Sequence, residues 1–388
     1  MVAAGKALTY AELAERAAAT QLPPLHATTT PAGIEFAVEL HAAALAESVI
    51  APLRPQQPGT EPVRCARLTG LVPPPGTLAV VFTSGSTGEP RPVPLTRRNF
   101  EASARASAEV LGVHADDRWL CCMPVFHVGG LSIFTRSALY GTTVVAEPGF
   151  DAVRVKDLME AGEVTVVSLV PTMLARLRDA GLERAPRVRA ILLGGGPIPD
   201  ELFAWARAAG LPVRPTYGMT ETTSQIATAR AGEWLARPLP GAEVRIADDG
   251  EILVRGPMVA ADGWLRTGDR GTLTEDGLLD VHGRMDDVIV TGGENVAAQE
   301  VEEVLLEHPY VAEAAVVGVD DAEWGKAVAA FVVAAVSEEE IAVHARARLP
   351  GFKVPKLIVA LDELPRTPSG KVERAQLESR ARDLRQGR

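Results

Sequence analysis

The chain has 388 residues, more than one hydrophobic core usually fills, so we expect at least two domains. Its 47% hydrophobic and 23% charged residues are typical of a globular protein and exclude a largely disordered one. The formal net charge of -11 argues against a general nucleic-acid binder, which usually carries a basic surface, but it does not exclude small anionic ligands.

The cysteines and the N-terminus indicate the cellular compartment. Cys121 and Cys122 are adjacent, which is a poor start for a disulfide framework, and only Cys65 remains besides them. Residues 1–20 lack a continuous apolar segment and are expected to form an amphipathic helix rather than a signal peptide. No apolar run approaches the roughly 18 residues that a membrane span needs. We therefore expect a cytoplasmic protein with no membrane span.

Up to about residue 240, short apolar runs alternate with helical patterns, which predicts an α/β fold of mixed, mostly parallel sheets with helices. The runs occupy residues 78–82, 142–146, 164–170 and 188–195. A helix is expected over 96–112, with Thr96 as its N-cap and Gly112 as its stop. The proline-rich segments 52–62 and 72–76 are expected to be surface connections, because proline cannot donate to a strand ladder.

From about residue 240 the pattern changes to short strands and tight turns. Asp-Gly pairs at 249–250 and 276–277 are hairpin signals, which predicts a small antiparallel, barrel-like part. The elements expected beyond it are a helix over 298–307, strands over 312–321 and 327–335, a helix over 337–348, and a basic tail. We predict a large N-terminal domain over 1–284 and a small α+β C-terminal domain over 285–388.

A loop rich in glycine and hydroxyl residues follows the strand expected at 78–82. It reads TSGSTG over 83–88, where glycines let backbone N–H groups turn toward an anion and hydroxyl groups add donors. The run departs from the Walker A pattern, because Glu89 follows Gly88 where that pattern needs lysine. By composition alone it is equally typical of a flexible surface turn.

Two further loops carry similar residues. GGGPIP (194–199) lies between a strand and a helix that Pro199 and Asp200 can start, although it is also typical of a tight strand-to-helix connection. PTYGMTETTSQIAT (215–228) combines an aromatic residue, hydroxyls and the carboxylate of Glu221. An aromatic ring can stack on a base, and a carboxylate can hold Mg²⁺ beside phosphates. Three such loops in one domain favour a ligand site.

These loops and several later segments resemble, in order, the motifs of the adenylate-forming superfamily of acyl-CoA synthetases, luciferases and peptide-synthetase adenylation domains. The matching segments are TSGSTGEPRPV, GGGPIP, YGMTET, GWLRTGD, GRMDDVIVTGGENV and PRTPSGKVER. The resemblance spans nearly the whole chain after residue 78. It implies two half-reactions: a carboxylate attacks the α-phosphate of ATP to give acyl-AMP and pyrophosphate, and the thiol of coenzyme A then displaces AMP.

The resemblance also implies roles for individual residues in nucleotide binding. Glu221 and Thr87 would hold Mg²⁺, Asp269 would accept hydrogen bonds from the ribose, and Arg284 would add a donor nearby. Taken without the resemblance, Asp269 would be read as a turn residue and Arg284 as a surface charge. The remaining residues expected to contact the nucleotide are Thr83, Ser84, Gly85, Ser86, Gly88, Gly194, Gly195, Gly196, Pro197, Thr216, Tyr217, Gly218, Met219 and Thr220. One departure is Arg91, where the superfamily usually carries lysine.

Lys371 matches the superfamily's C-terminal catalytic lysine, although composition alone would make it an exposed tail residue. The small domain that carries it would be mobile, so that it delivers the lysine for adenylation and then withdraws it, with Asp286 as the hinge. Gly292 and Gly293 would line the path of coenzyme A, although they are also typical of a plain turn.

Two segments resemble the o-succinylbenzoate-CoA ligases of menaquinone biosynthesis: YGMTETTSQIAT and PVFHVGGLSIFTRSALYGTTVV. This implies o-succinylbenzoate, ATP and coenzyme A as partners, with a homodimer as an open alternative, and the net charge already argues against nucleic acid. His127 would lie between the nucleotide and acyl pockets and act in catalysis with Lys371, Arg284 and Glu221. The alternative is that His127 is a hydrogen-bonded histidine of the core, without a role in catalysis. Residues expected to contact the acyl group besides His127 are Gly195, Ser224 and Gln225.

Two other functions share these motifs. Another aryl- or fatty-acyl-CoA synthetase, or a ligase that loads a carrier protein, would differ only in the acceptor and the acyl pocket. A nucleotide-binding regulator without catalysis would be expected to lack Lys371, Glu221 or Asp269, and all three are present. The sequence therefore favours an enzyme over a regulator.

Overall fold

The computed structural model describes residues 1–55, 68, 70–84, 90–285, 288–321, 323–366 and 372–386. The chain divides into two compact units. The first comprises Met1–Arg245, Leu253–Arg266 and Leu273–Asp280, and the second comprises Ile246–Ile252, Thr267–Thr272 and Val281–Arg388. Each unit is described by itself, and the domain boundary expected after residue 284 stays a prediction.

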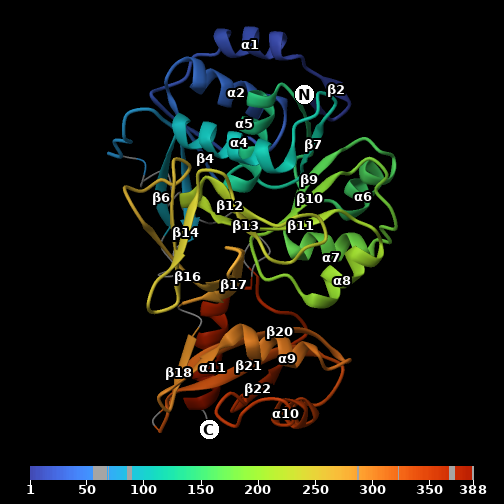
Figure 1. The fold of residues 1–388 in the computed structure, drawn as a ribbon, viewed down its shortest axis with the longest axis vertical. Helices are drawn as coiled ribbons and strands as arrows, with labels where there is room; N and C mark the ends of the chain where they lie inside the picture. Colours follow the sequence, from blue (N-terminus) through green and yellow to red (C-terminus); the bar gives the residue numbers. More distant parts are fainter. Residues whose placement is uncertain are drawn as a thin grey trace. The chain divides into compact units, whose positions relative to one another are not determined.

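A nine-stranded sheet in the order β13-β12-β11-β10-β9-β7-β8-β1-β2 organises the first unit (Figure 1). Its strands are β1 (Val2–Ala3), β2 (Lys6–Ala7), β7 (Arg118–Cys121), β8 (Thr143–Ala146), β9 (Val166–Leu169), β10 (Ala190–Leu193), β11 (Val213–Met219), β12 (Ser224–Thr228) and β13 (Arg237–Pro238). The neighbours from β1 to β11 are parallel, whereas β2, β12 and β13 add antiparallel pairs at the two ends. The predicted α/β fold with mostly parallel strands is confirmed.

Helices bury both faces of this sheet. They are α1 (Tyr10–Ala19), α2 (Ile34–Leu45), α4 (Arg97–Leu111), α5 (Val128–Tyr140), α6 (Ala152–Glu160), α7 (Pro171–Asp179) and α8 (Asp200–Ala208). In β10, Ala190 and Leu192 belong to the core formed with α2, α4 and α5, whereas Ile191 and Leu193 belong to the core formed with α6, α7 and α8. Because side chains alternate along a strand, a continuous apolar run fills both cores.

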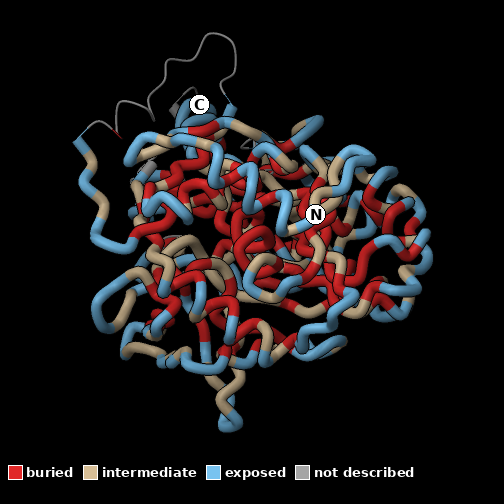
Figure 2. Tube along the Cα trace, turned by 90° about the horizontal axis from the view of Figure 1, so that it is seen from above, coloured by how far each residue is buried: buried red, intermediate tan, exposed pale blue. Residues whose placement is uncertain are grey.

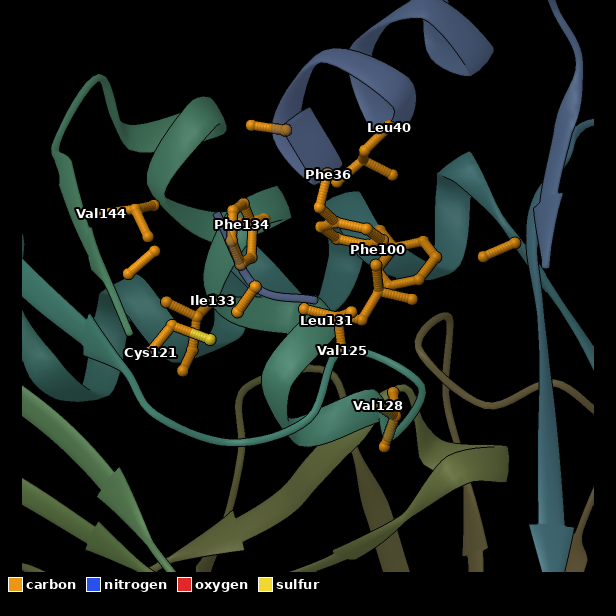
Figure 3. Close-up of a cluster of buried hydrophobic side chains, with 14 of the residues drawn as sticks. Phe36, Leu40, Phe100, Cys121, Val125, Val128, Leu131, Ile133, Phe134 and Val144 are labelled. Carbon is orange, nitrogen blue, oxygen red and sulfur yellow. The ribbon is translucent and has the colours of Figure 1, made fainter. Parts of the chain in front are cut away.

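The first of these cores surrounds α5 (Figure 3). Leu131, Ile133 and Phe134 project from this helix, and the Phe134 ring meets Phe36 of α2 edge-on, with the centroids 5.2 Å apart. Phe100 of α4 packs in the same cluster. Each such side chain stabilises the fold by about 1.5–3 kcal/mol relative to an exposed one. These contacts hold α5 firmly against α2 and α4.

Local signals placed α4 well, but the N-terminus differs from its prediction. The Thr96 side chain caps α4 by accepting a hydrogen bond from the backbone N–H of Asn99, and Gly112 ends the helix at φ +71°, as expected. The first seven residues were expected to be helical and instead form the β1-β2 hairpin, with α1 starting at Tyr10. Pairing of β1 with β8 explains the difference, because a sheet edge supplies hydrogen bonds that local propensity cannot anticipate.

A second sheet of the first unit has the order β3-β4-β5-β6. Its strands are β3 (Leu25–Thr28), β4 (Val49–Pro52), β5 (Thr77–Ser84) and β6 (Pro90–Thr96). The first three are parallel, and β6 runs antiparallel to β5. The segment 72–76 is a connection outside helices and strands, as predicted, whereas most of 52–62 lies outside the described residues.

The antiparallel part predicted after residue 240 is a four-stranded sheet in the order β14-β15-β16-β17. Its strands are β14 (Glu243–Ile246), β15 (Glu251–Arg255), β16 (Leu265–Leu273) and β17 (Leu279–Arg284). Both predicted Asp-Gly turns are confirmed, with φ +85° at Gly250 and +72° at Gly277. Glycine adopts these angles without strain, which explains the hairpin signals.

The second unit carries a five-stranded sheet in the order β19-β18-β21-β20, with β22 paired to β21. Its elements are β18 (Val288–Thr291), β19 (Glu294–Ala297), α9 (Ala298–Leu306), β20 (Val311–Asp321), β21 (Gly325–Ala334), α10 (Glu338–Arg346), β22 (Leu357–Ala360) and α11 (Arg374–Gln386). The helices and strands predicted over 298–348 are confirmed. The basic tail contains β22 and α11 instead, and α11 docks through buried Leu377 and Ala381, spaced one helical turn apart.

The buried residues lie mainly in the helices and strands described above, and Figure 2 shows exposed residues mainly at the outer turns of the trace. Cys121 and Cys122 are free, fully buried thiols. Burial raises the pKa of Cys122 to about 12 and raises the pKa of Cys121 as well. Among the described residues, no helix is both long and apolar enough to cross a membrane.

Buried thiols with a raised pKa should resist modification, because the thiolate is the reactive species. In a Cys65→Ser variant at pH 8, we expect Cys121 and Cys122 to be unreactive toward a disulfide reagent until the protein is unfolded in guanidinium, when both react. The measurement is a thiol titration of native and unfolded protein. Rapid labelling of two thiols in the native state would contradict the core described above.

Candidate active site

The strand order of the large sheet places several loops at one edge. β7 lies between β8 and β9, so the chain proceeds from β7 to one side and then crosses over to the other. In parallel sheets, ligands bind at the carboxyl ends of strands beside such a reversal. The segment to His127 follows the carboxyl end of β7, and Gly194 and Tyr217 lie at the carboxyl ends of β10 and β11. The topology therefore favours a ligand site at this edge.

Gly194 marks a close contact between two of these loops. A Cβ atom on Gly194 would lie 2.4 Å from Thr216 Oγ1 and 2.6 Å from Thr216 O. The Thr216 hydroxyl donates to Leu193 O at 3.3 Å. No larger residue fits at position 194, because Thr216 O belongs to the backbone and cannot move aside as a flexible side chain could. Gly195 has φ +83°, whereas Gly196 has no atom within 4 Å of its Cβ position and Pro197 precedes α8.

The YGMTETTSQ segment forms a tight turn between β11 and β12. A Cβ on Gly218 would lie 1.9 Å from Ser224 O, so only glycine lets the two strands approach. Between them, the short 3-10 helix η1 (Thr220–Thr222) carries Glu221, while Met219 ends β11. The hydroxyl of Thr222 accepts from Met219 N–H at 2.9 Å and donates to Ser224 O at 2.7 Å. The turn is thus held by its own side chains.

Glu221 is half-buried, and its backbone oxygen accepts a hydrogen bond from Ala260 N–H at 2.7 Å. Within the described part of the chain, no group of three or more His, Cys, Asp or Glu residues could form a metal cage. A single carboxylate suits Mg²⁺, which keeps several waters and takes its other ligands from substrate phosphates. The donor set therefore fits the metal role expected of Glu221, which stays a prediction.

His127 is the N-cap residue of α5 and is half-buried, with its Nε2 atom buried. Its ring lies 4.7 Å from the ring of Phe126. The helix begins close to its incoming chain, because a Cβ on Gly130 would lie 2.5 Å from Pro124 O. The structure places His127 at the expected edge of the sheet, and its catalytic role stays a prediction.

Ser224 and Gln225, expected to contact the acyl group, open β12. Ser224 is half-buried, whereas Gln225 is only 4% exposed. The Gln225 side chain accepts from Arg136 Nη1 at 3.1 Å and donates to Thr228 Oγ1 at 2.9 Å. Its amide is therefore engaged inside the protein, and a substrate contact for either residue stays a prediction.

The glycine-hydroxyl run follows β5 and leads into a strand. β5 and β6 pair from Thr77↔Thr96 to Ser84↔Pro90, with Thr83 opposite Arg91. The described element after the run is thus a strand, so the N-terminus of a following helix cannot supply the anion-binding N–H groups that a Walker A loop uses. Arg91 is exposed on β6, and Thr83 is half-buried on β5.

In the second unit, the structure brings Asp269 and Arg284 together. Arg284 Nη1 donates to Asp269 Oδ1 at 3.0 Å and to Thr267 O at 3.2 Å. Asp269 is 7% exposed, and the guanidinium is about half exposed. Gly268 at φ +72° lies against this guanidinium. An oriented carboxylate of this kind can accept from two hydroxyl groups, as the ribose role requires, and that role stays a prediction.

Gly292 and Gly293 form the turn of the β18-β19 hairpin. Their φ angles are +58° and +85°, the pair of positive values that a two-residue type I′ turn requires. A Cβ on Gly292 would also lie 2.6 Å from the Trp324 ring. Turn geometry alone accounts for both glycines, and a contact with coenzyme A stays a prediction.

Several expected site residues lie outside the described residues: Gly85, Ser86, Thr87, Gly88, Asp286 and Lys371. Ser84 is described only in its backbone, as the last residue of β5. The sequence analysis missed Thr223, whose hydroxyl donates to Met258 O at 2.7 Å and ties the turn to a distant segment. No local pattern marks it, because its partner lies 35 residues along the chain.

Comparison with known proteins gives consistent matches. A model of the AMP-binding enzyme family matches residues 69–262, and a model of the AMP-binding enzyme C-terminal domain matches 300–371. A 2-succinylbenzoate--CoA ligase of Bacillus cereus is 43% identical over 333 residues, which are 77% of this chain and 69% of the relative. One from Listeria monocytogenes is 40% identical over 327 residues, 78% of this chain and 70% of the relative.

Solved structures agree over almost the whole chain. The o-succinylbenzoate CoA synthetase (MenE) of Bacillus subtilis in complex with the acyl-adenylate intermediate OSB-AMP is 33% identical, with a TM-score of 0.84, and the match covers 97% of this chain and 94% of that one. The same enzyme with ATP and magnesium ion gives a TM-score of 0.87 over 97% and 95%. With these matches over both its large and small parts, the chain belongs to the AMP-binding enzyme family.

Proposed function

We propose that this protein is an ATP-dependent ligase that activates o-succinylbenzoate as an acyl-adenylate and transfers it to coenzyme A. The observation that carries the proposal is the identity of 40–43% with 2-succinylbenzoate--CoA ligases over more than three quarters of the chain. The product would be o-succinylbenzoyl-CoA, an intermediate of menaquinone biosynthesis. We also propose a cytoplasmic location, supported by the free buried thiols Cys121 and Cys122.

In the first half-reaction, a carboxylate oxygen of the acid attacks the α-phosphorus of ATP. The new bond joins acyl oxygen to phosphorus, and the bond to the bridging oxygen breaks and releases pyrophosphate. The demand on the protein is positioning and charge stabilisation. Glu221 would hold Mg²⁺, which supplies charge neutralisation at the phosphates. Asp269 would fix the ribose, and Lys371 would place a positive charge beside the reacting oxygens.

In the second half-reaction, the thiol of coenzyme A loses its proton and its sulfur attacks the acyl carbon. The carbon–oxygen bond to phosphate breaks, and AMP leaves. Because Lys371 and the incoming thiol need the same place, we propose that the C-terminal part moves between the half-reactions about Asp286. His127, at the start of α5 after β7, would separate the nucleotide from the acyl group.

Substrate choice tests the proposal. With a panel of carboxylic acids, we expect o-succinylbenzoate to support both pyrophosphate release and thioester formation, with kcat/KM at least about tenfold above simple aryl or fatty acids, because a pocket built for a second carboxylate is left with unpaired polar groups by those acids. The two products are measured separately. Efficient turnover of a fatty or simple aryl acid, with none of o-succinylbenzoate, would contradict the proposal.

Lys371→Ala should separate the half-reactions. We expect ATP–pyrophosphate exchange to fall by about 10²- to 10³-fold, because a charge aimed at the reacting oxygens is lost. Thioester formation from supplied acyl-AMP should stay within a few-fold of wild type. Lys326→Ala removes an exposed lysine of the same unit and serves as the matched control. Normal exchange in Lys371→Ala would show that this lysine is not catalytic.

Asp269→Asn should weaken nucleotide binding. The amide keeps the shape of the side chain but loses the charge-assisted hydrogen bonds, so we expect KM for ATP to rise by about tenfold while KM for the acid is unchanged. Asp276→Asn makes the same change in an exposed turn and should leave both values at wild type. Steady-state kinetics with either substrate varied give the comparison, and a rise in KM for the acid alone would argue against a ribose contact.

A further inference from the structure

Arg136 is a buried cation in the core of the first unit. It lies on α5 and is only 3% exposed. Its guanidinium donates to Gln225 Oε1 at 3.1 Å and to Ser103 Oγ at 2.9 Å, and its Cζ lies 5.9 Å from the centre of the Trp119 ring. Both hydrogen-bond partners are neutral side chains.

Such a position is costly for a charged group. Burial lowers the pKa of Arg136, which reflects the loss of hydration. A hydrophobic side chain of similar volume is often neutral or stabilising where a buried ion stands. The stability of the core therefore does not explain why arginine stands here, and the partners of its guanidinium point to another role.

The two hydrogen bonds of Arg136 lead to the two ends of one short segment, Thr223–Gln225. Ser103 on α4, which accepts from Arg136, donates in turn to Thr223 O at 3.0 Å. The other guanidinium nitrogen holds the Gln225 side chain directly. A planar guanidinium can span two acceptors in a fixed geometry, which a flexible ammonium cannot.

This segment needs to be held in place. Thr223 has φ +54° and Ser224 has φ +91°, and non-glycine residues at positive φ cost on the order of 1–3 kcal/mol each. Strain of this kind persists only where surrounding contacts over-determine it. The segment directly follows η1, which presents Glu221, so the position of that carboxylate depends on the strained pair.

The element that carries Arg136 is rigid. Leu131 and Phe134 anchor α5 in the apolar cluster of Figure 3, and Ser103 is 2% exposed on the neighbouring helix α4. A side chain that projects from packed helices can fix a loop more accurately than another loop can. The guanidinium is therefore a support for the turn at the carboxyl end of β11.

We propose that Arg136 is a positioning residue for nucleotide binding: through Ser103 and Gln225 it holds the strained Thr223–Gln225 segment so that Glu221 meets the magnesium–ATP complex. The role rests on the ATP-dependent step proposed above. It requires no contact between Arg136 and any substrate.

Arg136→Met tests the proposal, because methionine retains much of the volume and removes both donors. Binding of magnesium–ATP is measured by titration calorimetry without acid or coenzyme A. We expect Kd to rise by about tenfold, because both hydrogen bonds of the guanidinium are lost and the Thr223–Gln225 segment is held less firmly. The matched control is Arg214→Met. Arg214 is a half-buried arginine at the start of β11, and its guanidinium donates to Val110 O on α4. The Kd of this variant should equal that of wild type.

Ser103→Ala tests the route. It removes the bridge to Thr223 O, so Kd should rise, and the double variant Arg136→Met/Ser103→Ala should be no weaker than Arg136→Met alone, because both changes break one network. Circular dichroism and thermal unfolding report folding, and Ser103→Ala answers the question if Arg136→Met does not fold. Wild-type Kd in folded Arg136→Met or Ser103→Ala, or strictly additive losses, would overturn the proposal. A rise in KM for the acid with unchanged Kd for magnesium–ATP would overturn it too.

The experiment separates this inference from the proposed function. Wild-type protein that binds magnesium–ATP but does not activate o-succinylbenzoate would refute the proposed substrate and leave the role of Arg136 open to the same titration. Wild-type protein that does turn over o-succinylbenzoate, with Kd unchanged in Arg136→Met, would refute the role of Arg136 alone.

Discussion

Burial of both faces of the parallel sheet is the constraint on which the rest of the first unit depends. Each central strand supplies alternate side chains to two apolar cores, so helices must cover both faces of the sheet. Polar residues that could bind a ligand are therefore left to the loops at the ends of the strands. Because these strands are parallel, the loops after β7, β10 and β11 lie at one edge, which also holds the reversal at β7. The location of the candidate site is a consequence of how the core is filled.

The loops at this edge are packed structures. Gly194 and Gly218 stand where the backbone of a neighbouring strand leaves no room for a side chain, and Thr222 and Thr223 bind the turn through their hydroxyl groups. The cost of this arrangement is positive φ at two non-glycine residues. A site built in this way is preorganised, because its groups are oriented before a ligand arrives.

In the second unit, a candidate binding group is oriented by fewer contacts. One charge-assisted hydrogen bond from Arg284 orients the buried Asp269 carboxylate, and the neighbouring glycine leaves space for the guanidinium. The turn at Gly292–Gly293 has backbone angles that favour glycine. The presence of glycine there is therefore explained by the turn itself, whether or not these residues also contact coenzyme A. Gly194, Gly218, Gly292 and Gly293 thus report first on backbone geometry.

The sequence by itself determined the α/β class, the main strands, the capped helix α4 and both Asp-Gly hairpins, because these depend on period, caps and turn residues that act within a few positions. Ordered motifs identified the superfamily for the same reason. Only the tertiary structure decided that residues 2–7 form the β1-β2 hairpin, that α11 docks, and that Gln225 is engaged by Arg136. Those features arise between residues distant in the chain, such as the 89 positions that separate Arg136 from Gln225, and no local pattern records them.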